Sequence, residues 1–381
     1  MNPCGSTSGR AMQRRDELDR NRERATGGEE IQTEDLMRIK RTLLFSTALT
    51  TLLVPALLVP AAASAAPSPS EPTVELLASG LQGTTGSTIG PDGALYVTEG
   101  AIGEVTRIDP ETGATSTFAS GLPTSVVGIA GAIDIAFIGR TAYVLVSVVG
   151  PDAGGDQVDG IYRVDDADSF TIIADLGEFS KANPPATDFF LDQGVQFALE
   201  PIRDGFLVTD GHHNRVLKVM RSGDIEVFVA FDNIVPTGLA LSGRTVYMSE
   251  AGPIPYSPAD GKVVSFGLND PTVTEVASGF SLLIDVEFGK CGVLYALSQG
   301  DSPGMVPDGS PALPDSGELL RVNRDGTLVV VADGLNLPTS VDFVRDTALV
   351  TTLTGDVWKI SDVSKLALGD AKGNACRQNI H

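Results

Sequence analysis

One pattern repeats six times along this chain and restricts its fold more than any other feature. Each copy is a short β-prone run in which apolar residues alternate, followed across a glycine-containing turn by a second such run. A repeat of this size cannot bury its apolar faces alone, so it packs against its neighbours. The copies recur at a spacing of roughly 50 residues, at Leu95–Glu99, Ala142–Ser147, Phe206–Asp210, Val246–Glu250, Leu294–Ser298 and Ala348–Thr352.

A third set of runs shows how the repeats join end to end. In five repeats a third run follows the second one, starting at residues 116, 170, 225, 273 and 327. The sixth matching run, VELLASGL at 74, precedes the first repeat instead. A further short strand precedes each first run, and no segment after Ala66 has a helical period. The pattern predicts an all-β, six-bladed β-propeller of four-stranded antiparallel blades, closed by pairing of the N-terminal strand with the last blade.

The first 66 residues read as targeting sequence. Residues 1–36 are charged and poor in apolar positions, which predicts a disordered extension upstream of the true start. Residues 37–66 have a basic start, an apolar segment and small residues, which predicts a signal peptide cleaved near Ala65 and Ala66. We therefore expect a secreted protein without a membrane span, with a linker at 67–72, the propeller at 73–362 and a C-terminal tail at 363–381.

Charge and cysteine content narrow the classes of partner. The formal net charge of −22 repels phosphate backbones and anionic membranes, so nucleic acid is not an expected partner, and we expect a monomer. Apart from Cys4, the chain has Cys291 and Cys376, an even number that suits an oxidising compartment. They are expected to form a disulfide, and the alternative is two buried free thiols.

The segment DGFLVTDGHHNRVLKV, at 204–219, is the clearest repeat unit. Its apolar strand ending in Asp210, followed by Gly-x-x-Asn-Arg and another strand, resembles the NHL repeat of six-bladed propellers. Neighbouring residues of an extended chain point apart, so His212 and His213 are not expected to share a zinc ion, and we expect a structural or surface role for them. Asn214 suits turn chemistry, and Arg215 would reach a carboxylate or carbonyl between blades.

More of the chain supports a wider resemblance. The same segment, together with PTGLAL at 236 and VYMSEAGPIPYSPADGKVVSF at 246, resembles the ScyD/ScyE family of secreted bacterial propellers over residues 73–361. That resemblance implies the fold and export, and it does not imply a reaction. Long insertions at 150–160, 180–193 and 300–317 are candidate binding loops.

Acidic side chains recur along the predicted innermost strands. Aligned with Gly86 and Gly238, the equivalent positions of the other four repeats carry Asp134, Gln196, Asp285 and Asp342. Equivalent positions converge on a propeller axis, and close carboxylates favour a bound cation, a shared proton or water. Oxygen ligands suit Ca²⁺ or Mg²⁺, with Asp134, Asp285 and Asp342 as the metal ligands. The ends of the second strands add Glu99, Asp210 and Glu250, which predicts an acidic channel mouth.

Two functions follow from these patterns. The favoured one is an exported binding or scaffold propeller that presents a channel face and long loops to a small molecule, glycan or protein. The alternative is a metal-dependent lactonase-like hydrolase, similar in architecture to gluconolactonase-like propellers, in which an axial cation activates water. The sequence contains no Gly-x-Ser-x-Gly elbow and no glycine-rich phosphate loop, which disfavours serine hydrolases and nucleotide enzymes.

Overall fold

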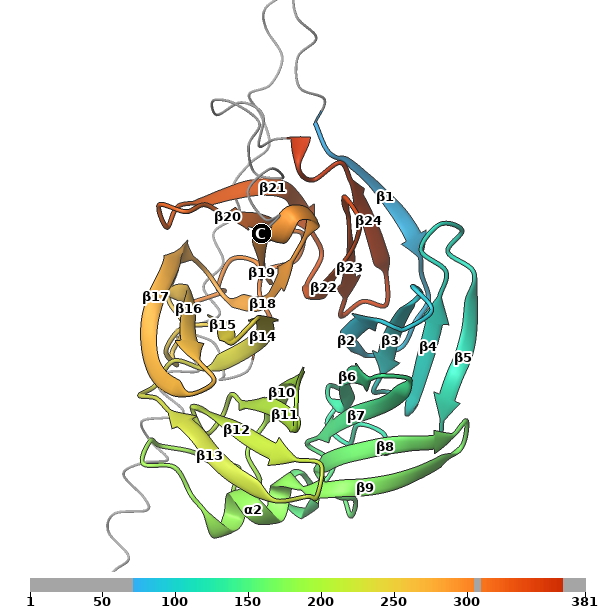
Figure 1. Ribbon diagram of the computed structural model, residues 1–381, viewed down its shortest axis with the longest axis vertical. Helices are drawn as coiled ribbons and strands as arrows, with labels where there is room; N and C mark the ends of the chain where they lie inside the picture. The colour runs from blue at the N-terminus through green and yellow to red at the C-terminus, as the bar shows by residue number, and fades with distance from the viewer. Residues whose placement is uncertain (1–70, 305–309, 366–381) are drawn as a thin grey trace, which may run out of the picture. The chain divides into compact units, whose positions relative to one another are not determined.

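The computed structural model describes residues 71–304 and 310–365, which form six four-stranded antiparallel sheets arranged radially about a central axis (Figure 1). The innermost strands are β2 (Thr84–Ile89), β6 (Gly131–Ile138), β10 (Gln196–Ile202), β14 (Pro236–Ser242), β18 (Leu283–Phe288) and β22 (Pro338–Val344). The second strands are β3 (Leu95–Glu99), β7 (Thr141–Ser147), β11 (Gly205–Asp210), β15 (Thr245–Glu250), β19 (Leu294–Ser298) and β23 (Thr347–Thr352). The predicted six-bladed propeller is confirmed.

The two outer layers complete each blade. The third strands are β4 (Glu104–Ile108), β8 (Gly160–Asp166), β12 (Arg215–Met220), β16 (Gly261–Gly267), β20 (Gly317–Val322) and β24 (Val357–Ser361). The outermost strands are β5 (Thr115–Ser120), β9 (Ser169–Asp175), β13 (Ile225–Ala230), β17 (Asp270–Phe280), β21 (Leu328–Leu335) and β1 (Thr73–Ala78). β1 pairs antiparallel with β24, with Val74 opposite Ile360, so the first strand of the propeller closes the last blade as predicted.

Each innermost strand carries a register shift near its start, where it pairs with the second strand. Such a β-bulge leaves a backbone N–H without its usual partner in the ladder. In three blades a hydroxyl of the second strand accepts this hydrogen bond: Gly86 N–H donates to Thr98 (3.1 Å), Ala198 N–H to Thr209 (2.9 Å) and Gly238 N–H to Ser249 (2.9 Å). In these three blades the hydroxyl residue before the end of the second strand therefore stabilises the bulge.

The strand order sends long and short connections to opposite faces. Second-to-third strand loops and the links to the next blade leave at one end of every sheet, and we call this end the loop face; it contains the insertions at 148–159, 183–195, 251–260 and 299–304. The opposite end, the turn face, has the short turns between the first and second strands, at 90–94, 139–140, 203–204, 243–244, 289–293 and 345–346.

The core lies between adjacent blades, because each sheet is apolar on both faces near the axis. Between the second and third blades, Leu145, Phe206 and Leu217 are fully buried, and the rings of Tyr143 and Phe206 lie 4.9 Å apart. Equivalent clusters repeat around the ring. This continuous packing holds the innermost strands, and the side chains on them, in fixed positions.

The expectation of a helix-free propeller is wrong at one insertion. Helix α2 (Leu176–Ala182) follows β9, and the Asp175 carboxylate accepts a hydrogen bond from the Glu178 N–H at 2.8 Å, which caps its first turn. Seven residues are too few for a clear helical period, so the pattern was not visible. Two short 3-10 segments, η1 (Pro151–Ala153) and η2 (Lys290–Gly292), complete the elements.

Among the described residues, no helix is long and apolar enough to cross a membrane. The predicted extension at 1–36, the signal peptide at 37–66, with its cleavage site at Ala65 and Ala66, and residues 366–381 of the predicted tail lie outside the described residues. Export therefore stays a prediction.

Candidate axial site

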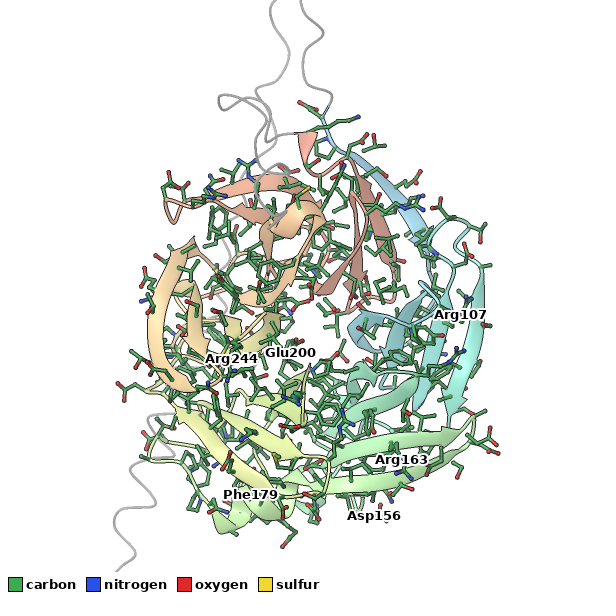
Figure 2. All side chains as sticks on the ribbon, in the orientation of Figure 1. Arg107, Asp156, Arg163, Phe179, Glu200 and Arg244 are labelled. Atoms are coloured by element: carbon green, nitrogen blue, oxygen red, sulfur yellow. The ribbon has the colours of Figure 1, made fainter. Side chains whose placement is uncertain are left out.

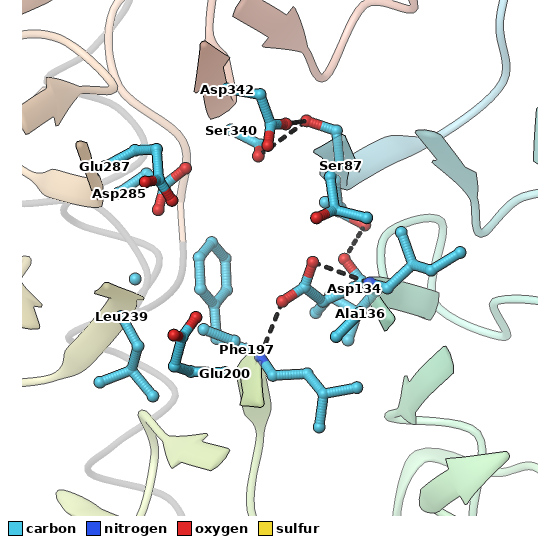
Figure 3. Close-up of a pocket in the computed structure, with 18 of the residues that line it drawn as sticks. Ser87, Asp134, Ala136, Phe197, Glu200, Leu239, Asp285, Glu287, Ser340 and Asp342 are labelled. Carbon is cyan, nitrogen blue, oxygen red and sulfur yellow. Dashed lines mark hydrogen bonds between the residues drawn. The ribbon is translucent and has the colours of Figure 1, made fainter. Parts of the chain in front are cut away.

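A cavity of about 70 Å³ lies at the propeller axis and is lined by the innermost strands (Figure 3). Five carboxyl groups line it, together with the hydroxyls of Ser87 and Ser340; the acids are Asp134, Glu200, Asp285, Glu287 and Asp342. A volume of this size holds only a few water molecules. The structure thus brings Asp134, Asp285 and Asp342 to one cavity, and it adds two glutamates that the sequence reasoning missed.

The three aspartates bond to the blade that follows them. One oxygen of Asp134 accepts from the next residue's N–H (2.8 Å), and the other accepts from Leu199 N–H of the third blade (2.7 Å). Asp285 repeats this geometry, with its own neighbour's N–H at 2.9 Å and Val341 N–H of the sixth blade at 2.8 Å. Ser87 of the first blade donates to Asp342 at 2.6 Å. These carboxyl groups therefore link adjacent blades.

The strand register does not place all four predicted residues at equivalent positions. Asp134 and Asp285 share the position of Gly86 and Gly238, whereas Asp342 lies two residues later on its strand. The bulge turns the side chains at these different positions toward the same cavity. Gln196 lies two residues earlier, does not line the cavity, and accepts a hydrogen bond from Ser147 at 2.9 Å.

Glu200 and Glu287 occupy the same strand position as Asp342. A sequence signal for this set exists: each acid lies three residues before a basic residue in the turn that follows, namely Arg203, Lys290 and Arg345. Aligning the innermost strands on Gly86 and Gly238 compares residues near the start of each strand. The acids near the strand ends are therefore not compared with one another.

Burial raises the pKa of every acid in the cavity. The pKa of Asp285 rises to about 7, that of Asp342 to about 6 and that of Glu200 to about 8. Loss of hydration is the main cause, and for Asp285 and Glu200 the charge of a neighbouring aspartate adds to it. Burial also raises the pKa of Asp134 and of Glu287 well above the ordinary value. The cavity consequently holds protons at neutral pH.

The residues present do not fit Ca²⁺ or Mg²⁺. No group of three or more His, Cys, Asp or Glu side chains in the described residues is arranged to hold a metal ion. Asp134 and Asp285 each have both carboxylate oxygens engaged by backbone N–H groups, which leaves fewer lone pairs for a cation. A cation needs several oxygens at one centre. The carboxyl groups are accommodated by protonation and hydrogen bonds.

The two glycines aligned with the aspartates have a steric role. A Cβ at Gly86 would lie 2.4 Å from Oδ1 of Asp134, and a Cβ at Gly238 would lie 2.3 Å from Oδ1 of Asp285. Each glycine therefore makes room for the linking aspartate of the next blade.

Gly238→Ala is expected to destabilise the propeller by at least about 2 kcal/mol, because the new methyl group also meets the Asp285 backbone Cα at 2.6 Å. Urea unfolding followed by tryptophan fluorescence measures this loss. Gly267→Ala is the control, since its nearest contact is the Asp270 carbonyl oxygen at 3.1 Å and its expected cost is below about 1 kcal/mol. Equal costs for the two variants would contradict the steric role.

Glu99, Asp210 and Glu250 do lie at the ends of second strands on the loop face, but they do not form an acidic mouth. All three are buried and none lines the axial cavity. Glu99 accepts a hydrogen bond from Gln82 N–H at 2.8 Å, and burial raises the pKa of Glu250 to about 7. They are internal polar groups because the loops fold over the strand ends.

Asp210 belongs to a buried ion network that holds the insertion at 183–195. Its carboxylate lies 3.1 Å from Arg215 Nε and 3.2 Å from His213 Nδ1, and it accepts a hydrogen bond from Val195 N–H at 3.1 Å. Burial would raise the pKa of Asp210, but the His213 hydrogen bond and the charges of His213 and Arg215 hold it below the ordinary value. Arg215 also donates to the Asn183 carbonyl at 2.6 Å, as its predicted role required.

The paired histidines are part of the same structure. His213 is buried and its Nε2 lies 2.9 Å from the Leu191 carbonyl, while His212 Nε2 accepts from Phe190 N–H at 2.8 Å. Both rings therefore fix the backbone of the insertion. No metal-binding group includes them among the described residues.

Cys291 is disulfide-bonded, and its predicted partner Cys376 lies outside the described residues.

Comparisons with known proteins place the chain in a class of folds. No family model matches it, and no curated protein sequence matches it. It is similar to a gluconolactonase from Xanthomonas campestris, with 14% identity, a TM-score of 0.54 and coverage of 76% of this chain and 89% of the other. It is also similar to a PQQ-bound aldose sugar dehydrogenase from Streptomyces coelicolor (13%, TM-score 0.50, coverage 78% and 99%).

A third similar structure is a putative glucose dehydrogenase from Thermus thermophilus, with 16% identity, a TM-score of 0.51 and coverage of 76% and 99%. At identities this low, the likeness concerns the fold alone. The protein is a six-bladed β-propeller, and its site must be interpreted from its own residues.

Proposed function

We propose that this protein is an exported propeller that binds a small molecule, glycan or protein through its loop face. The observation that carries the proposal is a set of large apolar side chains exposed on the loops of that face. Phe190 is 68% exposed and Val127 is 51% exposed, and the others are Val126, Ile129, Phe189 and Leu313. Exposed apolar residues concentrated on loops are typical of interaction sites.

The insertion that presents Phe190 is rigidly supported. His212 and His213 bond to its backbone, and the Phe190 ring lies 4.2 Å from the His212 ring in an edge-on arrangement. The buried Asp210–Arg215 pair lies directly beneath it. A preorganised apolar side chain loses little conformational freedom on binding, which favours affinity.

Export and family membership are part of this proposal. The basic, apolar and small-residue pattern at 37–66 supports export through a signal peptide. The motifs at 204–219, 236–241 and 246–266 support membership of the ScyD/ScyE family. Both agree with a binding role outside the cytoplasm.

The alternative is a lactonase-like hydrolase that uses the axial acids. The raised pKa values of Asp285 and Glu200 favour it, because a carboxyl group that titrates near neutral pH suits general acid–base catalysis. Two observations oppose it: the cavity of about 70 Å³ is too small for a sugar lactone, and its aspartates do not fit a metal.

Binding and catalysis can be separated by experiment. The labelled mature protein is tested on arrays of glycans and immobilised extracellular proteins, and we expect Val127→Ser combined with Phe190→Ser to weaken binding at least tenfold. The control combines Val273→Ser with Val329→Ser, two exposed valines on outermost strands, and should bind normally. Lactone hydrolysis with Ca²⁺ that Asp285→Asn abolishes would overturn the binding proposal in favour of the hydrolase.

A further inference from the structure

The turn face carries a ring of basic residues around the channel mouth. Each turn between a first and a second strand borders the axis, and five of these six turns contain a cation: Arg140, Arg203, Arg244, Lys290 and Arg345. The sixth contains Asp92, which is paired with Arg107 of its own blade at 2.8 Å. In Figure 2, Arg244 and Glu200 are labelled nearer the centre than Arg107 and Arg163. We call the five cations the basic ring.

Most of the basic ring is not neutralised by the protein. The four arginines are exposed, and none has a side-chain hydrogen bond or ion pair with another described residue. Lys290 Nζ lies 3.5 Å from Asp346 Oδ2, which is a long distance for an ion pair, and the pair lies on the surface. Surplus guanidinium groups are unexpected in a chain with 27 basic and 49 acidic residues. Their donors are free for a ligand.

Three acids lie in the same six turns as the ring. Asp92 pairs with Arg107, Asp346 accepts a hydrogen bond from Ser364 Oγ at 2.8 Å as well as contacting Lys290, and Asp204 directly follows Arg203. Within the channel mouth, Glu200, Glu287 and Asp342 lie one or two residues before the strand ends. Burial raises the pKa of all three, to about 8 for Glu200 and about 6 for Asp342, which reduces the negative charge that these groups place beside the ring.

A second cavity gives the size of a ligand. It has a volume of about 360 Å³, lies beside the ring on the turn face, and is lined by Arg345 and Lys359 among other residues. Three acids also line it: Asp346 is engaged by Ser364 and Asp362 by Lys365, whereas Glu111 is exposed, and Lys359 is paired with Glu75 at 3.3 Å. This volume accommodates a sugar unit, in contrast to the axial cavity.

We propose that the basic ring binds an anionic glycan, with the carboxylate or sulfate groups of its sugars on the arginines. Guanidinium groups bind such anions through paired hydrogen bonds, and a sugar-sized cavity adjoins the ring. Among described residues, no large apolar side chain is exposed on these turns, so the face has no anchor for a lipid surface. This site goes beyond the proposed function, which uses the opposite face.

Titration calorimetry of the full mature protein with tetragalacturonate tests the ring, with neutral maltotetraose as the ligand control. We expect Arg203→Ser combined with Arg244→Ser to weaken tetragalacturonate binding at least tenfold, and maltotetraose not to bind. The matched control combines Arg163→Ser with Arg324→Ser, two arginines that lie outside the ring and make no hydrogen bond or ion pair with its residues in the described part of the chain. It removes the same charge outside the ring and should cost less than threefold.

Several results would overturn the assignment: equal losses in both double variants, tighter binding of duplex DNA or of phosphatidylglycerol vesicles than of the glycan, or no tetragalacturonate binding at low salt. The Val127→Ser and Phe190→Ser changes on the loop face should leave tetragalacturonate binding unchanged. Failure at one face is therefore distinguishable from failure at the other.

Discussion

The propeller is expected to unfold at a higher urea concentration at about pH 5.5 than at about pH 8, with a difference of at least about 3 kcal/mol in the free energy of unfolding. The source is the axial cavity, where burial raises the pKa of Asp285 from 3.8 to about 7 and that of Glu200 from 4.5 to about 8. For Asp285 alone the shift corresponds to on the order of 4 kcal/mol.

The sign follows from the direction of these shifts. A carboxyl group whose pKa is raised by folding binds its proton more tightly in the folded state. Its contribution is complete below the unfolded pKa of about 4 and is lost as the pH rises through the folded values, which lie between about 6 and 8 here. Asp210 has the opposite shift, so stability should fall again in stronger acid.

Neutral variants and metal give the decisive comparison. Asp285→Asn combined with Glu200→Gln should remove most of the pH dependence between about pH 5.5 and pH 8, because two of the titrating groups are gone. Stability that instead increases with pH, or that rises at pH 8 on addition of Ca²⁺, would contradict protonation of the cavity and favour a bound cation.

Asp210→Ala is expected to destabilise the protein by about 3 to 5 kcal/mol, because it leaves the buried charge of Arg215 without its carboxylate. The side chains of both residues are almost fully buried, at 0% and 3% exposure. The variant also releases Val195 N–H, so the insertion at 183–195 should exchange its amide hydrogens faster than the rest of the propeller. Urea unfolding and hydrogen exchange measure the two effects.

Asp165→Ala provides a control with the same chemistry on the surface. Asp165 pairs with Arg163 at 2.6 Å, but the two side chains are 32% and 40% exposed, so solvent screens the pair and we expect a much smaller loss of stability than for Asp210→Ala. Comparable costs for the two variants, or unchanged exchange in the insertion, would show that the Asp210 network does not hold the loop.

The sequence was sufficient for the blades and for their closure. Alternation with a period of two identifies half-buried strands, and the displaced run at Val74 could pair only with the last blade, next to Ile360. Both signals are local or periodic. Helix α2 was not predicted because a helix of this length is too short to show a helical period of apolar residues. Glu200 and Glu287 were not predicted because each is a single acid among apolar residues near the end of its strand.

The candidate site was only partly predictable, and the reason is register. A bulge in every innermost strand changes which side chains face the axis, so Asp342 reaches the cavity from a position two residues beyond that of Asp134 and Asp285. No sequence pattern showed that the carboxylate oxygens of Asp134 and Asp285 would accept hydrogen bonds from the N–H groups of Leu199 and Val341. The sequence therefore predicted a metal site where the structure has hydrogen bonds between adjacent blades.

By itself, the sequence determined a closed ring of six four-stranded blades, because the period of its apolar residues and the offset of one strand are properties of the chain alone. Tertiary structure decided which polar residues are buried, paired or free. It turned Asp210 and His213 inward as supports of a loop, and it left Arg140, Arg203 and Arg244 unpaired at one channel mouth. Burial and pairing depend on residues that are distant in the chain, so they become defined only when the blades close around the axis.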